Sequence, residues 1–388
     1  MDAVETLQSQ IHELETVMRF YDQEKPDEIQ KRKELEVLWQ DKNKSLTFLQ
    51  KTKGKGVPSL EGKDSFLYKN WDIKNLLEYA KEVNLPYRSL LSFDAKYRFG
   101  MEIEVENIDR TFLNEWMQKK KSLFYYYECH KEETVESIIN GNRLGCEVVT
   151  PPYHNKIQTW KELEKVCTFL KRNGARITKK CGGHIHGDAA ILDYEEETVK
   201  KVLKLWAVYE PVFFRLFMGD FYQVRDLTYA EALQKLIVEK INYIDTHCLT
   251  QIKSELFPNK RKSFNILNFD AMKSYAKNTL ELRFPNGSLN PWIWQNHINI
   301  FIHFLLCCRN TNELDTYIQD KMKKWKTGST TAYTEMHLEE VLALCDLLFE
   351  NNRDKYALLK EYLHSYQNPK ETYIPNLNDG QPPKIMVK

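Results

Sequence analysis

The chain has 388 residues, of which 42% are hydrophobic and 12% aromatic, so a packed core is expected and wholesale disorder is excluded. Lysine and arginine (56 residues) nearly balance aspartate and glutamate (55 residues), and the net charge of +1 provides no general attraction for nucleic acid or for an anionic membrane. The eight cysteines form no CxxC pair, which is typical of reduced thiols in a cytoplasmic protein rather than of a disulfide framework.

The N-terminal segment, residues 1–70, is expected to form a helical hairpin. Apolar residues recur at alternating steps of three and four, the spacing of a helical seam, at Val4, Leu7, Ile11, Leu14, Met18 and Tyr21. Pro26, followed by Asp27 and Glu28, favours the start of a second helix, because proline fits the first turn and acidic groups are stabilised at the positive end of the helix dipole. The seam fits a structural brace better than a docking surface or self-association through residues 4–21. No signal-peptide core is present at this end of the sequence.

Residues 51–64, KTKGKGVPSLEGKD, form a linker that resembles a phosphate-binding loop only superficially. The spacing from Gly56 to Gly62 and Lys63 is one residue longer than that motif requires, and Asp64 replaces the Ser or Thr that would hold magnesium. The sequence also lacks the GxGxxG pattern of a dinucleotide-binding turn. We therefore expect no nucleotide at this linker.

Between residues 90 and 310, short strand patterns alternate with helix patterns. Strands are expected at 97–108, 145–154, 175–188, 261–269 and 278–290. Helices are expected at 159–171, 195–217, 228–256 and from Pro291 onward. For the first of these helices, Thr159 and Glu162 predict a capping box and Asn173–Gly174 predicts the end. This order favours an α+β fold in which helices pack on one side of an antiparallel sheet.

The last part of the chain is expected to be mostly helical. The apolar stretch 292–308 is interrupted by polar residues and is shorter than the roughly 20 apolar residues of a membrane span, so we expect a core helix there. Two more helices, at 335–350 and up to Tyr366, complete a C-terminal helical part over 311–366. The proline-containing tail, 367–388, is expected to be extended.

Acidic, imidazole and guanidinium groups recur two residues apart on the predicted strands, where side chains i and i+2 project from the same face. These pairs, with one further acid, are Glu102 and Glu104, His184 and His186, Glu281 and Arg283, and Glu147. Singly, each pair has an ordinary explanation, such as a solvated strand face or a surface ion pair. If all of them share one face of the sheet, the carboxylates repel one another unless cations neutralise them.

A sheet face of this composition suits Mg²⁺ or Mn²⁺ together with a ligand that carries phosphate, because these hard cations prefer oxygen donors. Arg283 would hold phosphate oxygens in a bidentate manner. Gly182 and Gly183 would let the backbone approach a bulky ligand just before the two histidines. A metal–nucleotide site is the interpretation that uses all of these residues.

Five segments, in this order, resemble the motifs of the amidoligase family: FGMEIEVE, CEVVTPP, GGHIHGD, RKSFNILNF and LELRFPNGSLNP, within about residues 97–310. The resemblance implies a carboxylate–amine ligase fold related to glutamine synthetase and γ-glutamylcysteine ligase. It also implies an ATP-dependent reaction, in which a carboxylate donor forms an acyl-phosphate and an amine acceptor displaces the phosphate. The acceptor or donor would be a metabolite, a peptide or a protein terminus. Met101 departs from the family pattern, which has a small aliphatic residue there.

The same resemblance implies roles for individual residues. Two or three divalent ions would be bound by carboxylates and one imidazole, from the set Glu102, Glu104, Glu147, Glu281 and His184 or His186. Arg283 would stabilise the transferring phosphoryl group, with Glu281 beside it in the catalytic centre. Arg261, Asn265 and His186 would contact ATP or substrate. The resemblance does not decide between the two histidines as the metal ligand.

Two other functions stay open. The segment HIHGD, residues 184–188, opens several zinc-hydrolase signatures, but Ala189 stands where such a signature has a further histidine, and zinc favours His and Cys over a ring of glutamates. The other is a non-catalytic module that binds nucleotide and engages a partner through the hairpin. The presence of all the acids together with Arg283 argues against that module.

Overall fold

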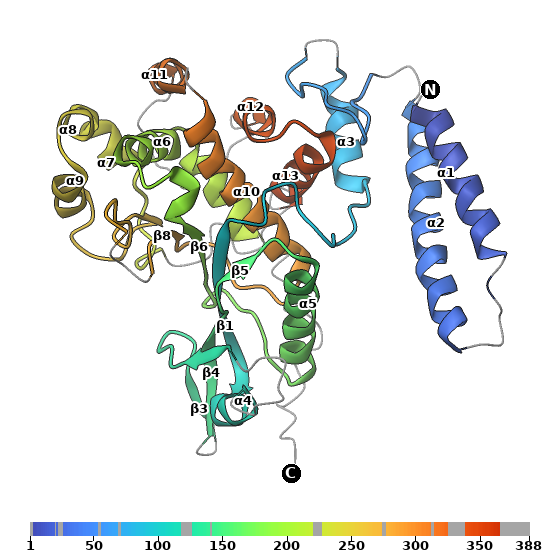
Figure 1. Ribbon diagram of the computed structural model, residues 1–388, viewed down its shortest axis with the longest axis horizontal. Helices are drawn as coiled ribbons and strands as arrows, with labels where there is room; N and C mark the ends of the chain where they lie inside the picture. The colour runs from blue at the N-terminus through green and yellow to red at the C-terminus, as the bar shows by residue number, and fades with distance from the viewer. Residues whose placement is uncertain are drawn as a thin grey trace. The chain divides into compact units, whose positions relative to one another are not determined.

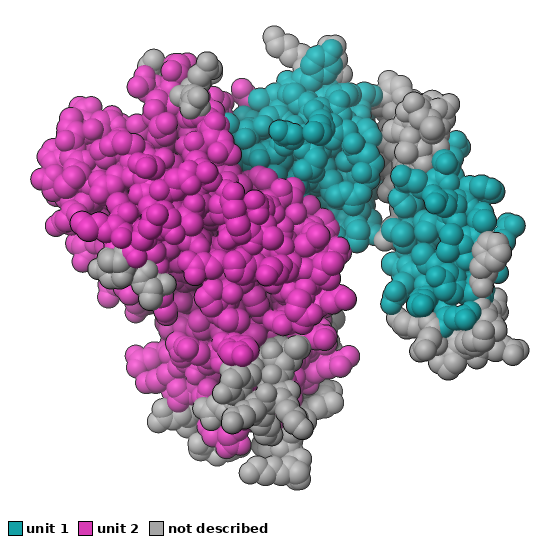
Figure 2. Space-filling view, viewed as in Figure 1, with its two compact units in different colours: residues 1–86, 341–363 teal, residues 87–340, 364–388 magenta. Residues whose placement is uncertain are grey.

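The computed structural model describes residues 3–19, 21, 26–52, 56–68, 71–117, 126–139, 142–219, 227–273, 277–311, 314–324 and 338–364. The chain divides into two compact units, shown in different colours in Figure 2. The smaller unit comprises residues 1–86 and 341–363, and the larger unit comprises residues 87–340 and 364–388. All of the candidate site residues, from Glu102 to Arg283, belong to the larger unit.

The N-terminal hairpin of the smaller unit consists of α1 (Ala3–Met18) and α2 (Pro26–Thr52), seen in blue in Figure 1. Ile11 of the predicted seam is buried, and the Trp39 indole of α2 donates a hydrogen bond of 3.0 Å to Glu15 of α1. Lys42 adds a second polar link, 2.7 Å long, to Gln10. Both predicted helices and the start of the second one at Pro26 are therefore confirmed.

The rest of the smaller unit contains α3 (Ile73–Glu82), most of α12 (Leu338–Leu348) and α13 (Asn352–His364). Tyr356 of α13 packs its ring against Phe66 and Tyr79, with ring centroids 4.8 and 4.9 Å away. Asp346 of α12 accepts a hydrogen bond of 2.8 Å from the backbone N–H of Phe66. The two predicted C-terminal helices are confirmed, and the predicted tail 367–388 lies outside the described residues.

The larger unit is built on an eight-stranded sheet. Its strands are β1 (Arg98–Asp109), β2 (Glu128–His130), β3 (Ser137–Ile139), β4 (Asn142–Val149), β5 (Tyr153–His154), β6 (Gly183–Asp188), β7 (Phe264–Asn265) and β8 (Thr279–Leu282). The strand order is β2-β4-β1-β6-β8-β7, with β3 paired to β4 and β5 paired to β1, and all the neighbours are antiparallel. Strands far apart in the sequence thus become neighbours at β1-β6 and β6-β8.

The described helices of the larger unit are α4 (Arg110–Met117), α5 (Ile157–Arg172), the 3₁₀ helix η1 (Ala189–Leu192), α6 (Glu196–Met218), α7 (Gln234–Glu239), α8 (Ile241–Thr246), α9 (Leu249–Leu256), α10 (Pro291–Asn310) and α11 (Leu314–Lys324). Several of them cover one face of the sheet. On that face, Trp160 of α5 stacks on Phe99 of β1, and Trp206 of α6 stacks on Phe264 of β7. The α+β class with an antiparallel sheet is confirmed. No described helix combines the length and apolar character needed to cross a membrane.

Local structure differs from the sequence-based expectation in several of the predicted segments. The expected strand 175–188 is a strand only from Gly183, as β6. The segment 228–256 is not one helix but three short ones, α7, α8 and α9, with His247 and Cys248 extended between the last two. The segment 261–269 pairs at only two residues, because the Asn265 side chain accepts the Leu267 N–H at 2.8 Å and turns the chain. The segment 278–290 pairs only over its first part, as β8.

The predicted capping box of α5 is also wrong. The helix begins at Ile157, two residues before Thr159, and Lys156 is its N-cap without a side-chain hydrogen bond. Thr159 is buried inside the helix instead. The end of α5 is as expected, with Asn173 as the C-cap and Gly174 at a positive φ of 88°, a conformation that glycine adopts without a Cβ clash.

Candidate functional site

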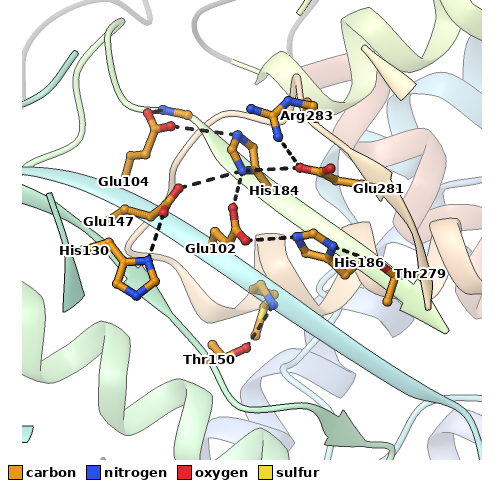
Figure 3. Close-up of polar contacts among 12 residues, drawn as sticks. Glu102, Glu104, His130, Glu147, Thr150, His184, His186, Thr279, Glu281 and Arg283 are labelled. Atoms are coloured by element: carbon orange, nitrogen blue, oxygen red, sulfur yellow. Dashed lines mark hydrogen bonds and ion pairs between the residues drawn. The ribbon is translucent and has the colours of Figure 1, made fainter. Parts of the chain in front are cut away.

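The candidate residues lie on the face of the sheet opposite the covering helices. In the registers of neighbouring strands, Glu104 is opposite Glu147 and Glu102 is opposite His184. His186 is opposite Glu281, which in turn is opposite Asn265. Residues directly opposite each other in an antiparallel pair project to the same face. The sheet therefore brings together acids from β4, β1 and β8, and the imidazoles of β6 lie among them (Figure 3).

Glu102 is at the centre of this group, between the two histidines. One of its oxygens is in a short contact with Nδ1 of His184, and the other lies 3.1 Å from Nε2 of His186. Burial alone would raise the pKa of Glu102, but the hydrogen bonds and charges of both imidazoles outweigh burial and lower that pKa. For His186, burial lowers the pKa, whereas Glu102 and Glu281 raise it by more, so the net shift is upward. Glu102 and His186 are thus partly buried groups whose charges stabilise one another.

Glu104 and Glu147 form the acidic end of the site, toward β4. Glu104 is 7% exposed and accepts a short hydrogen bond from the backbone N–H of Gly182. Oε1 of Glu147 lies 3.8 Å from Nδ1 of His184, too far for a hydrogen bond. Burial, followed by the nearby charges of Glu102, Glu104 and Glu132, raises the pKa of Glu147 to about 8. This end thus has more carboxylates than the surrounding side chains neutralise.

Glu281, Arg283 and Asn265 form the other end of the site, at β8 and β7. An Nη1 hydrogen of Arg283 is donated to the buried carboxylate of Glu281. The Nε of Arg283 and the Nδ2 of Asn265 are buried without a hydrogen-bond partner among the described residues. Asn265 is 2% exposed and uses its Oδ1 for the Leu267 N–H, so its unpaired N–H groups are held in place. Buried donors without a partner are rare, and these two are available to an anionic or carbonyl-bearing ligand.

Among the described residues, three overlapping groups of side chains have ligand atoms within 4.8 Å of one another, a spacing that allows each group to hold one cation. The groups are Glu102, Glu147 and His184; Glu102, His186 and Glu281; and Glu104, Glu132 and Glu147. Carboxylate oxygens with one imidazole are a donor set that suits Mg²⁺ or Mn²⁺. Glu102 and Glu147 each belong to two groups, so they are the residues that connect the proposed cation positions.

The sequence-based set of residues missed Glu132 and His130. Glu132 lies in the turn after β2, and Nδ1 of His130 on β2 is 3.9 Å from Glu147. His130 reaches Glu147 because β2 pairs with β4. A signal was available in the sequence, because Glu128, His130 and Glu132, within ECHKEE, are spaced two residues apart like the pairs on the other strands.

Two other predicted residues, Arg261 and Gly183, do not face the carboxylates of the candidate site. Arg261 is exposed, with its guanidinium over the ring of Tyr229 at 5.4 Å, and its contacts are with that region rather than with the carboxylates. Gly183 does not face the site, because a Cβ at this position would overlap the ring of Trp294 in α10. The absence of a side chain at Gly183 therefore serves helix–sheet packing and not the approach of a ligand. Gly182, in contrast, does reach the site, through its N–H to Glu104.

Comparison with protein families provides a match to part of the chain. Residues 117–305 match the model of a protein family described as "Putative amidoligase enzyme". The matched segment includes Glu147, His184, His186 and Glu281, and it begins after the strand that carries Glu102 and Glu104. None of the curated proteins compared with the chain matches it. The match supports a ligase role, and over residues 117–305 the chain is similar to the amidoligase family.

Proposed function

We propose that the chain is an ATP-dependent carboxylate–amine ligase that works through an acyl-phosphate. We assign this activity to residues 90–310 and to a sheet of the glutamine synthetase-like type. The observation that carries the proposal is the set of three overlapping cation-compatible groups at one sheet face, five of whose seven residues lie within the segment that matches an amidoligase family. Phosphoryl transfer depends mainly on positioning and charge neutralisation rather than on covalent chemistry by the protein.

The side chains of the site fit Mg²⁺ or Mn²⁺. The donors are oxygen-rich, and burial together with the neighbouring carboxylates raises the pKa of Glu147, a repulsion that a bound cation would relieve. The residues that would hold the ions are Glu102, Glu104, Glu132, Glu147, His184, His186 and Glu281. The bound cations would supply positive charge against the phosphate oxygens of ATP.

Arg283 and Asn265 would bind the anionic part of the ligand at the β8 end. The guanidinium has a free buried Nε, and the amide has a free buried Nδ2, so both present N–H groups in fixed positions. Arg283 now pairs with Glu281, and a phosphate would share the guanidinium in a charge-assisted hydrogen bond. Held in this way, the γ-phosphate would be oriented toward the carboxylate donor, and the developing charge would be stabilised by donors that need little rearrangement.

The test is calorimetric titration of the protein with Mg²⁺ and a non-hydrolysable ATP analogue. We expect binding by the wild type and its loss in Glu281→Gln, because that change removes a ligand from one group and the partner of Arg283. Glu128→Gln is the matched control, since Glu128 is exposed, contacts His130 and belongs to none of the three groups. Equal binding by Glu281→Gln and the wild type would contradict the proposed site.

Turnover is tested by magnesium-dependent release of ADP and phosphate with panels of carboxylates and amines, including peptides. Release that requires both substrate classes supports the ligase. Binding of the analogue without turnover over a broad panel would favour a non-catalytic nucleotide-binding module. The panel also identifies the donor and the acceptor.

A metallohydrolase built on the HIHGD segment receives less support from the geometry. The carboxylate of Asp188 lies 2.6 Å from Nε of Arg98 and caps the N–H of Ala190, and it belongs to none of the three cation-compatible groups. The two histidines share Glu102 instead. Tight zinc binding that neither magnesium nor nucleotide affects would revive the hydrolase interpretation.

A further inference from the structure

A buried carboxylate outside the polar sheet face links α6 to the strand that carries Asn265. Glu210, in the middle of α6, is completely buried. It accepts hydrogen bonds from the indole of Trp206 at 2.8 Å, from the backbone N–H groups of Leu233 and Gln234 at 2.8 and 2.6 Å, and from the hydroxyl of Ser263 at 2.8 Å. Every partner is a donor, so the four groups fully satisfy an ionised carboxylate.

Pro211, the residue after Glu210, provides a second point at which α7 is hydrogen-bonded to α6. Pro211 has no N–H, so the carbonyl of Ala207 lacks its usual hydrogen bond within the helix. The side-chain amide of Gln234 donates to that carbonyl at 2.7 Å. Glu210 and Ala207 together therefore hold the start of α7 through two independent contacts.

Ser263 connects the buried carboxylate of Glu210 to the candidate site through hydrogen bonds. It is completely buried, its N–H is donated to the carbonyl of Glu231 at 2.8 Å, and its own carbonyl accepts the N–H of Arg283 at 2.8 Å. The two residues that follow it, Phe264 and Asn265, are the whole of strand β7. A two-residue strand at the edge of a sheet has few ladder bonds of its own, so its position depends on the contacts at its ends.

We propose that Glu210 is a positioning residue of the candidate site, which acts through Ser263 to hold Asn265 and the backbone of Arg283 beside Glu281. This inference rests on the proposed function, because it requires that Asn265 and Arg283 contact the nucleotide or substrate. The hydroxyl of Ser263 gives the buried carboxylate a hydrogen-bonded link to the residue before β7, whereas Trp206, the other side-chain partner of Glu210, reaches β7 by stacking on Phe264. Removing that hydroxyl separates the positioning role from the general stability of α6 and α7.

The experiment compares three variants of the full chain in calorimetric titration with Mg²⁺ and a non-hydrolysable ATP analogue, each with a thermal melt. Ser263→Ala removes the link to β7, and we expect the affinity for the analogue to fall on the order of tenfold, as for other residues that orient a ligand-binding group. Gln234→Leu is the matched control, because it breaks the contact with Ala207 without touching Ser263. It should lower the melting temperature and leave the affinity unchanged.

Glu210→Gln is the conservative variant that should keep the affinity for the analogue, because it keeps the hydrogen bond with Ser263. The amide oxygen can still accept hydrogen bonds from Ser263, Trp206 and Leu233. The NH₂ group that replaces the second carboxylate oxygen cannot accept the N–H of Gln234. We expect reduced stability with retained affinity. Hydrogen exchange at the Leu267 N–H, which is bonded to Asn265, should be faster in Ser263→Ala than in Gln234→Leu.

The possible failures are distinguishable. No binding by the wild type would overturn the proposed function and this inference with it. Binding by the wild type with unchanged affinity in Ser263→Ala would overturn the positioning role alone. Equal losses of affinity in Ser263→Ala and Gln234→Leu would also overturn it, because they would indicate general loosening of the fold.

Discussion

The two faces of strand β6 place different demands on six consecutive residues. Gly183 and Gly187 face α10, where an added Cβ would overlap Trp294 at one position and crowd Leu305 at the other. His184 and His186 face the opposite side, among carboxylates. The first face is closely packed and uncharged, whereas the second collects charges that are only partly neutralised. A sheet whose sole task was stability would not bury so many acids, so the comparison separates residues kept for packing from residues kept for ligands.

The largest effect is expected from Glu102→Gln on the polar face. Glu102 belongs to two of the three cation-compatible groups, so its loss should weaken Mn²⁺ binding roughly a hundredfold, equivalent to about 2.7 kcal/mol. Titration of Mn²⁺ followed by electron paramagnetic resonance measures the change, with circular dichroism to verify the fold. Glu128→Gln is the control with unchanged binding. Wild-type affinity in Glu102→Gln would show that this face does not bind metal through Glu102.

The next effect concerns the packed face. Gly183→Ala should reduce the free energy of unfolding by about 1–3 kcal/mol, because the new methyl group must displace the ring of Trp294. Gly100→Ala on β1 is the matched control, since a Cβ there has ordinary contacts with His186 and Thr150, 3.9 and 4.0 Å away. Urea unfolding of both variants makes the comparison. Equal stabilities of the two variants would remove the distinction between the faces.

A smaller effect, of opposite sign, is expected at Glu147. Its pKa is about 8 in the folded protein against 4.5 as the ordinary value, so the folded state binds the proton more tightly than the unfolded state. This contribution is complete below pH 4.5 and is lost as the pH rises through 8. In metal-free protein, Glu147→Gln should therefore be more stable than the wild type at pH 9, with a smaller difference at pH 5. Melts with a chelator at both pH values test this, and a destabilised variant at pH 9 would contradict it.

The smallest effect is expected at the border of the polar face. His130 is exposed, and its Nδ1 lies 3.9 Å from Glu147. Because exposed ion pairs contribute little, His130→Ala should change Mn²⁺ affinity by less than about threefold. The same titration measures it. A loss comparable to that of Glu102→Gln would extend the metal-binding face to β2.

Much of the local structure follows from the sequence. The i, i+2 spacing on β1, β6 and β8 predicted which side chains share a face, because a strand has a period of two whatever surrounds it. Pro26 and Pro291 marked the starts of two helices for an equally local reason, since proline fits the first turn. Turn and cap signals were less dependable. Thr159 had the spacing of a capping box, but the helix already begins at Ile157, and Thr159 is buried within it.

The tertiary structure decided which strands meet. Glu102 and Glu281 are far apart in the sequence, and they come together only because β6 lies between β1 and β8. Pairing between distant strands depends on the packing of the whole sheet, which no local period encodes. The same reason applies to Glu132, brought to Glu147 by a turn, and to Glu210, whose burial and attachment to Ser263 depend on how α6 lies against β7. The sequence by itself determined the chemistry of each strand face, and the fold determined that these faces form one site.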